Sequence, residues 1–173
     1  TVRFMSFGDA RKDGKGTPAY HRVLVEYLHV EGYKTAFNLP KSGHIVLRNN
    51  YVHHQFGNAV VFSNLEWPSR LTLDICGNEV AHAGYGNALH GFYLHRGLHP
   101  ESSAEIALVD NLCHSTPYSS CFKSIANNHV VKGNRCYQSL DTDPSYETRS
   151  SSMLIDLAAC ADKRMDDNEF HGH

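Results

Sequence analysis

Residues 106–134 read IALVDNLCHSTPYSSCFKSIANNHVVKGN and contain one complete structural period of this chain. The period opens with alternating apolar residues from Ile106 to Leu108, and Asn111 follows at a fixed distance. A second short segment with alternating character spans 121–124, and the next period brings Asn134. Apolar residues that alternate with a period of two predict short β-strands. The stretch therefore predicts a unit of short strands that recurs along the chain.

The same pattern, apolar-x-apolar-x-x-Asn-x-apolar, recurs through the sequence. Full copies begin at Ile45, Leu73 and Ile106, shorter copies at Val131 and Met165, and a copy without the asparagine at Val23. Six copies start about every 22 to 34 residues, and no segment of ten or more residues has the 3.6-residue periodicity of a helix. Short strands repeated at such a period without helices predict a parallel β-solenoid, in which each turn stacks on the last.

A solenoid of this kind stacks equivalent side chains in ladders, which the alignment of the copies names. We expect one inner ladder of Leu47, Ile75, Leu108, Val131 and Met165, and another of Val52, Val80, Cys113, Cys136 and Phe170. We expect a corner ladder of Asn50, Asn78, Asn111, Asn134 and Asn168. Asparagine tolerates the left-handed backbone of a sharp bend, and its amide can both donate and accept a hydrogen bond between turns. These asparagines are therefore predicted to be structural.

The asparagine-corner repeat resembles the right-handed parallel β-helix repeats of the pectate-lyase-like superfamily. The resemblance covers residues 21–173, nearly the whole chain. It implies an all-β, single-stranded, right-handed parallel β-helix of about six rungs. That superfamily includes polysaccharide lyases, glycoside hydrolases, epimerases, phage tailspikes and adhesins, so the likeness implies several activities.

The copies predict one domain over residues 1–173, in which residues 1–20 form a cap or a partial rung. Unequal rung lengths place loops, marked by proline and serine, at Ser63–Arg70, Gly97–Ser103 and Ser139–Ser151. Long loops on a rigid repeat commonly form a wall of a binding face. The first residue is not a methionine and the last residues stop inside a rung. We therefore expect a fragment, or an end that missing chain segments or an oligomer partner cover.

Composition excludes several classes of function. The chain has 16 lysines and arginines against 18 acidic residues, without the basic face that a nucleic-acid partner requires. No apolar run approaches the roughly 18 residues of a membrane span. Five cysteines without a CxxC pair favour buried apolar thiols over a disulfide framework or a zinc knuckle. For a carbohydrate-active β-helix we expect a secreted or periplasmic location.

The second strands of three successive copies align a compact polar group. If Phe92, Phe122 and Ile155 point inward, the residues that follow each of them point outward. Those outward residues are Tyr93, Lys123 and Asp156, and His95 lies on the same face, two residues after Tyr93. A slip of one residue would turn Lys123 inward, and a buried lysine without a partner is costly, which favours the outward register.

These residue types suit the elimination chemistry of uronates. Eliminative cleavage needs a cation for the substrate carboxylate, a base for the adjacent proton and an acid for the leaving oxygen. An aspartate beside Lys123 favours a carboxylate clamp over a base, which leaves Tyr93 or His95 as the base. Substrate-binding walls are expected from Arg96, Tyr146, Glu147 and Arg149. The catalytic face is thus predicted to contain Lys123, Tyr93, His95 and Asp156.

The Phe122-Lys123-Ser124 segment is also similar to the Lys-Ser of alginate and chondroitin lyases built on this fold. In those enzymes an Arg-His-Gly follows in the next rung. Here the matching place reads Ile155 to Ala159, without an arginine, and Arg149 is the nearest replacement. A lyase acting on an acidic polysaccharide is the first hypothesis. A non-catalytic carbohydrate-binding or attachment module is the second, and a glycoside hydrolase or uronate epimerase is the third.

We expect no cofactor, although one loop and one set of histidines leave a bound ion open. The loop that contains Asp141, Asp143 and Glu147 could bind calcium without matching a calcium-loop motif. Histidines recur at fixed distances after the ladder asparagines, at His53, His54, His82, His114 and His171. They are predicted to be surface residues at a corner, although stacked imidazoles beside a carboxylate would permit a metal. His129 is expected to be a satisfied core residue.

Overall fold

The computed structural model describes residues 3–6, 21–39, 43–63, 70–84, 90–95, 103–116, 120–137, 155–158 and 162–171. Every regular element in these ranges is a β-strand. The described residues include no helix that is long and apolar enough to cross a membrane.

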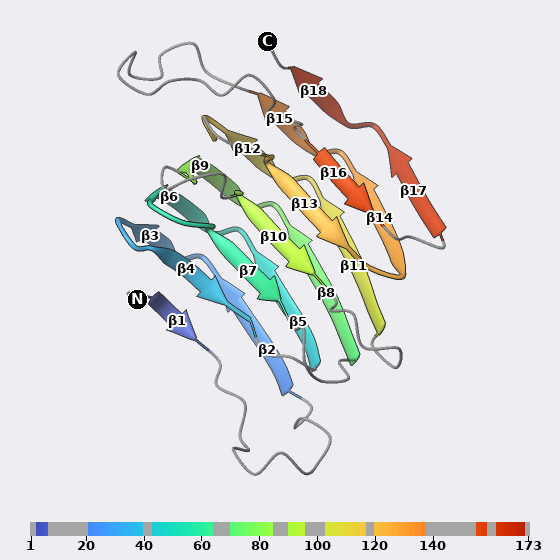
Figure 1. The fold of residues 1–173 in the computed structure, drawn as a ribbon, viewed down its shortest axis with the longest axis horizontal. Coiled ribbons are helices and arrows are strands. Elements are labelled where there is room, and N and C mark those ends of the chain that lie inside the picture. Colours follow the sequence, from blue (N-terminus) through green and yellow to red (C-terminus); the bar gives the residue numbers. More distant parts are fainter. Residues whose placement is uncertain are drawn as a thin grey trace.

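The described residues form three parallel sheets of six strands each, and the chain visits them in turn (Figure 1). Sheet A contains, in spatial order, β1 (Arg3–Ser6), β4 (Thr35–Asn38), β7 (Val60–Ser63), β10 (Phe92–His95), β13 (Phe122–Ile125) and β16 (Ile155–Ala158). Sheet B contains β17 (Asp162–Asp166), β14 (Asn128–Lys132), β11 (Ser103–Val109), β8 (Arg70–Cys76), β5 (Gly43–Arg48) and β2 (His21–Glu26). Sheet C contains β18 (Glu169–His171), β15 (Arg135–Tyr137), β12 (Leu112–His114), β9 (Glu79–Ala83), β6 (Tyr51–Gln55) and β3 (His29–Glu31).

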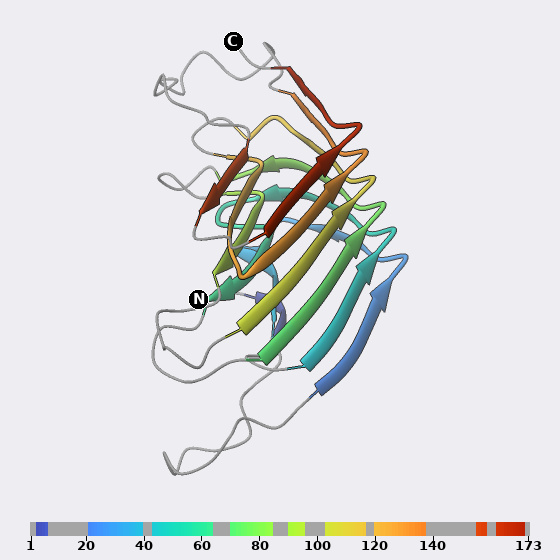
Figure 2. The ribbon, with the colours of Figure 1, turned by 90° about the vertical axis from the view of Figure 1, so that its right-hand side faces the viewer.

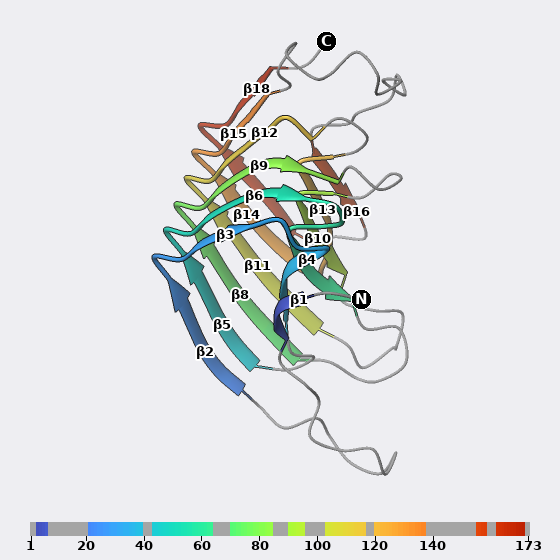
Figure 3. The same ribbon diagram turned by 90° about the vertical axis from the view of Figure 1, so that its left-hand side faces the viewer.

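Each rung runs from sheet B through sheet C to sheet A, and each strand pairs with its equivalent in the neighbouring rungs. Figures 2 and 3 show the strands of sheet B stacked side by side from opposite sides of the molecule. The predicted all-β parallel solenoid of about six rungs is confirmed. Strand β1 pairs with β4 in parallel, so residues 3–6 add one strand before the first full rung.

The predicted inner ladders form in register. Leu47 lies opposite Ile75, Ile75 opposite Leu108 and Leu108 opposite Val131. All four are at most 1% exposed, as expected for an interior in which equivalent apolar residues stack. Met165 continues the register in β17, but the expectation that it stacks inside is wrong, because it is 45% exposed. It lies in the outermost strand of sheet B, so only one neighbouring strand covers it.

The corner between sheet B and sheet C has the same length in all six rungs. Two residues separate the strands each time, as in Gly77-Asn78 between β8 and β9. The residue with the left-handed backbone is the first of the two, one position before the ladder asparagine (or before Leu28 in the first rung), and not the asparagine itself as predicted. These residues are Tyr27, Asn49, Gly77, Asp110, Gly133 and Asp167. The ladder asparagine is thereby free to use its amide along the axis of the solenoid.

The asparagine amides hydrogen-bond from rung to rung as predicted. The Nδ2 of Asn78 donates to Asn111 Oδ1 at 3.0 Å, and it also donates to the carbonyl oxygen of Leu47 at 2.9 Å. The same Asn111 oxygen accepts the backbone N–H of Asn78 at 3.0 Å. Equivalent amide contacts join Asn50 to Asn78, Asn111 to Asn134 and Asn134 to Asn168. The ladder thus satisfies backbone groups that a buried bend would otherwise leave unpaired.

A second bend, at or just after the ends of the sheet C strands, also stacks residues with a left-handed backbone. These residues are Gly32, His54, His82 and Ser115, one in each of four successive rungs. Glycine adopts a left-handed backbone without strain, and histidine is one of the residues enriched in this conformation among those that are not glycine. This bend gathers the imidazoles of His54 and His82 beside the outer face of sheet C.

Candidate functional site

The predicted polar face lies on sheet A in the predicted register. Tyr93 in β10 lies opposite Lys123 in β13, and Lys123 lies opposite Asp156 in β16. The side chains of Phe92 and Phe122 are fully buried, with ring centroids 4.9 Å apart. Tyr93 and Lys123 are partly exposed, so they lie on the outer side of the same two strands. The alternation of the strands therefore positions tyrosine and lysine side by side on one face.

Two imidazoles lie beside the Tyr93 ring. His90 stacks on it with centroids 5.4 Å apart and planes 13° apart, and His95 lies 6.3 Å away. Both histidines are buried, so His95 is less accessible than its expected position at the edge of the face implies. The His90 Nδ1 accepts the backbone N–H of Ser120 at 3.3 Å, which orients its ring.

His90 was not predicted, because it precedes the strand and no alternation marks it. A Cβ at the next position, Gly91, would lie 2.8 Å from both Cys113 Sγ and Cys121 O. The absence of a side chain at Gly91 therefore lets the chain approach the core closely just before β10, and this approach positions the His90 backbone.

The rest of the predicted site is only partly described. Arg96, Tyr146, Glu147 and Arg149, the expected walls, lie outside the described residues, as do the calcium-loop residues Asp141 and Asp143. Asp156 is described by its backbone alone. Within the described part, the face on sheet A therefore consists of Tyr93, Lys123 and the two histidines.

The interior behind sheet A contains a polar pair that solvent does not reach. Ser124 Oγ and His129 Nε2 lie 2.6 Å apart, and both residues are at most 2% exposed. The prediction that His129 is a satisfied core residue is confirmed. This pair joins sheet A to sheet B, and its depth excludes contact with a large substrate.

Cysteines fill the neighbouring core. Cys113, Cys121 and Cys136 are fully buried free thiols, and the Cys121 thiol donates to the Cys113 carbonyl oxygen at 3.2 Å. Burial raises the pKa of Cys113 well above its ordinary value, since a thiolate would lose its hydration there. The three residues are packing groups, as the sequence predicted for most of the cysteines.

A shallow hollow of about 450 Å³ on sheet B was missed by the sequence prediction. Its lining includes Thr72 and Asp74 of β8, Glu105 of β11 and Asn128 of β14. Glu105 lies opposite Thr72, so the two carboxylates belong to neighbouring strands two positions apart in register. Asp74 Oδ2 also lies 2.7 Å from the Nε2 of His44. Alternation within β8 and β11 was the available signal. Leu73 and Ile106 face the core, so their sequence neighbours Asp74 and Glu105 face the outer side of the sheet.

The outer side of sheet C contains a continuous stripe of aromatic rings. Neighbouring centroids lie 4.6 to 6.0 Å apart, from β3 across to β15. The stripe consists of His29, Tyr51, His53, His54, His82, His114 and Tyr137. The recurrence of histidine after the ladder asparagines predicted most of it. His29 was not predicted, because it lies opposite Tyr51, one residue after the corner, and not at the positions three or four residues after it where the other histidines recur.

Burial within this stripe keeps two imidazoles neutral. It lowers the pKa of His53 and of His82 below the ordinary value of 6.5, because a charged ring would lose hydration. The neighbouring imidazoles of His54 and His114 lower the pKa of His82 further. At neutral pH these rings can therefore act as acceptors or as metal ligands.

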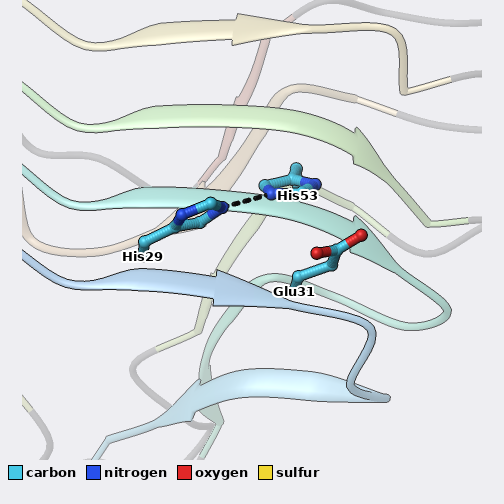
Figure 4. Close-up of side chains that lie close together, drawn as sticks. All are labelled: His29, Glu31 and His53. Carbon is cyan, nitrogen blue, oxygen red and sulfur yellow. Dashed lines mark hydrogen bonds between the residues drawn. The ribbon is translucent and has the colours of Figure 1, made fainter.

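One group in the stripe brings three candidate metal ligands together. One ligand atom each from His29, Glu31 and His53 lie within 4.8 Å of one another, and they form the one such group among the described residues. Figure 4 shows His29 and Glu31 extending from β3 toward His53 on β6. Two imidazoles and a carboxylate form a donor set that binds zinc and similar ions.

No protein-family model, no curated protein and no solved structure matches this chain. The described residues and their geometry are therefore the basis for inferring its function.

Proposed function

We propose that this protein is a carbohydrate-active β-solenoid that binds a uronate-containing polysaccharide along sheet A and cleaves it by β-elimination. The observation that carries the proposal is the register of Tyr93 opposite Lys123, on the outer side of strands whose phenylalanines are buried. That register aligns a cation and a phenol on one rigid face. A reaction that removes the proton beside a carboxylate needs a cation and a base, and a phenol can serve as the base.

Lys123 is assigned the role of binding the substrate carboxylate. Its partner in register on the next strand is Asp156. A charged lysine is a poor base but a good partner for a uronate. Its position on a strand, and not on a loop, holds it at a fixed distance from Tyr93.

Tyr93 is assigned the role of base, with a histidine as its partner. The ring of His90 stacks on it, and the His95 ring lies 6.3 Å from it. Sugar rings pack well against aromatic faces, and imidazoles can relay the proton to the leaving oxygen. Because His95 is buried, it is better suited to orient Tyr93 or to protonate the leaving oxygen than to make the first contact with the polymer.

A second candidate activity is glycoside hydrolysis at the hollow on sheet B. Asp74 and Glu105 line that hollow together, and paired carboxylates are the usual catalytic groups of glycosidases. Two carboxylates repel a uronate, so this surface favours a neutral or amino sugar. The two candidates therefore predict different substrates at different faces.

A single set of incubations separates the candidates. The protein is incubated with alginate, pectate and glycosaminoglycans, and the ultraviolet absorbance of unsaturated sugar ends is followed, since only elimination generates it. We expect absorbance to rise, and we expect Lys123→Ala and Tyr93→Phe each to lower kcat/KM by about 100-fold. The matched controls are Lys132→Ala on sheet B and Tyr137→Phe on sheet C, which should retain activity.

Other results contradict the lyase proposal in distinct ways. New reducing ends without absorbance, lost in Asp74→Asn and Glu105→Gln, would assign hydrolysis to sheet B. Binding without either product would assign a non-catalytic carbohydrate-binding module. Absorbance that survives both sheet A substitutions would keep the activity but reject the site.

A further inference from the structure

We propose that His29, Glu31 and His53 form a binding site for a divalent transition-metal ion of the zinc class on the outer face of sheet C. This site departs from the expectation that the chain needs no metal. It is independent of the proposed carbohydrate activity, because its residues lie on β3 and β6 and the proposed catalytic residues lie on β10 and β13.

The strand register creates the convergence of the three side chains. His29 and Glu31 are two residues apart in β3, so they point to the same side of the sheet. Glu31 lies opposite His53 in β6, which places the second imidazole across from the carboxylate. Two neighbouring parallel strands therefore supply three ligands without any contribution from a loop.

The distances between the ligand atoms fit a shared ion after a small adjustment. The two Nε2 atoms of His29 and His53 lie 2.5 Å apart. Two nitrogens that bind one zinc tetrahedrally, each at about 2.0–2.1 Å, are roughly 3.3 Å apart. A rotation of the exposed His29 side chain supplies the missing separation of less than about 1 Å. The carboxylate of Glu31, also exposed, can turn to complete the group.

His53 is held in place by contacts that resemble the outer shell of a metal site. Its Nδ1 lies 2.6 Å from the Nδ1 of His54, and its ring stacks on Tyr51 with centroids 4.6 Å apart. The Nε2 of Gln55 donates to the His53 carbonyl oxygen at 2.8 Å. If His53 donates its Nδ1–H to His54, its Nε2 lone pair faces His29. Such a partner on the far nitrogen fixes the tautomer of a metal-bound histidine.

The charges and donor types select the class of ion. Two neutral imidazoles and one carboxylate offset one of the two positive charges of the ion. Imidazole ligands favour zinc, cobalt, nickel or copper over calcium and magnesium, which prefer oxygen alone. Three protein ligands leave a fourth tetrahedral position, and the exposure of His29 and Glu31 opens that position to solvent. A bound ion would also connect the rungs that contain β3 and β6.

Zinc titration of the full chain tests the site directly. The protein is first stripped with a chelator, and zinc binding is then followed by calorimetry and by the melting temperature. We expect one tight site per chain and a zinc-dependent rise in the melting temperature, since an ion that binds only the folded state stabilises it. His29→Ala and Glu31→Gln should each weaken this site by at least about tenfold.

The controls distinguish this trio from the rest of the histidine stripe. His114→Ala removes the residue that occupies the equivalent position of His53 two rungs away, and it should leave zinc affinity unchanged. Cobalt bound to the wild-type protein should give the intense visible bands of a tetrahedral site, and Glu31→Gln should abolish them. Glu31→Gln retains the size and position of an exposed side chain, so it decides the matter if His29→Ala does not fold.

Three results would overturn the proposal. The first is a wild-type protein that binds zinc no more tightly than His29→Ala. The second is an affinity that falls in His114→Ala and not in Glu31→Gln. The third is a cobalt spectrum typical of a six-coordinate hydrated ion. None of these results depends on whether the protein cleaves a polysaccharide.

Discussion

At the residue scale, one asparagine in each corner carries several buried hydrogen bonds. Asn111 donates to the carbonyl oxygen of Ile75 at 2.8 Å and to Asn134 Oδ1 at 2.9 Å. Its own oxygen accepts from both the backbone and the side chain of Asn78. Because the residue is 1% exposed, water cannot replace these partners. At a surface turn, water would satisfy these backbone groups; in this buried corner the amide of Asn111 does so.

Replacing this amide should destabilise the protein strongly. Asn111→Ala leaves a buried carbonyl and a buried N–H without partners, at about 1–3 kcal/mol each, so we expect a total loss of about 3 kcal/mol or more. Asn128→Ala, which changes an exposed asparagine in β14, is the matched control and should cost less than about 0.5 kcal/mol. Urea denaturation of both variants measures the difference. Equal losses would show that the ladder contributes nothing beyond the corner's backbone.

At the scale of one element, the outer face of sheet C is a titratable surface. Burial and neighbouring imidazoles lower the pKa of His53 and His82. Glu31 and Glu79 act on His53 in the opposite direction, as acidic neighbours that favour its charged form. The net shift for both rings is downward, so folding holds them neutral over a range in which the unfolded chain would protonate them.

The sign of the resulting pH dependence follows from proton counting. Below about pH 6.5 the unfolded state binds more protons at these rings than the folded state, so stability falls as the pH is lowered. We expect the melting temperature, measured with chelator present, to decline between pH 7.5 and pH 5. His82→Asn should flatten that decline, because asparagine tolerates the left-handed backbone at this position without a titrating group.

A matched substitution on another sheet tests whether the effect belongs to the stripe. His44→Asn changes a half-buried histidine on β5, which contacts Asp74 and not the stripe. It should leave the decline in place. A decline that persists unchanged in His82→Asn, or that disappears in His44→Asn, would contradict the assignment.

At the scale of the whole molecule, every rung depends on its neighbours for burial. Leu73 in the central strand β8 is fully buried, whereas its in-register counterpart Val23 in β2 is only partly buried, and the neighbouring inward row ends at Met165 in β17, which is 45% exposed. A solenoid is stabilised by contacts between nearest neighbours, so a rung covered on one side is held less firmly than a rung covered on both. Stability should therefore vary along the axis.

Hydrogen exchange measured by mass spectrometry reads out this variation. We expect the amides of β8 and β11 to exchange slowest and those of β2 and β17 to exchange fastest, because local opening begins where fewest contacts are lost. Uniform protection across these four strands would instead indicate that the solenoid opens only as a whole.

The sequence predicted contacts between equivalent positions of the repeat and missed contacts between positions that are not equivalent. Alternation was enough to place Tyr93 beside Lys123, since parity alone decides which residues face outward. The group of His29 and His53 and the pair of Asp74 and Glu105 were missed. His29 lies opposite Tyr51, at a strand position where no other copy has a histidine, and Asp74 and Glu105 lie two positions apart in register, so an alignment of equivalent positions pairs neither group. The exposure of Met165 was missed because the pattern does not mark the outermost strand.

The two-residue corner between sheets B and C also limits how such a chain can change in length during evolution. A residue inserted there would move the left-handed position and the ladder asparagine out of line with those of every other rung. The connections that enter and leave sheet A differ in length from rung to rung, so they already accommodate insertions and deletions. New binding segments should therefore be acquired, or grafted by engineering, around sheet A, while the opposite corner keeps the length of its turn unchanged.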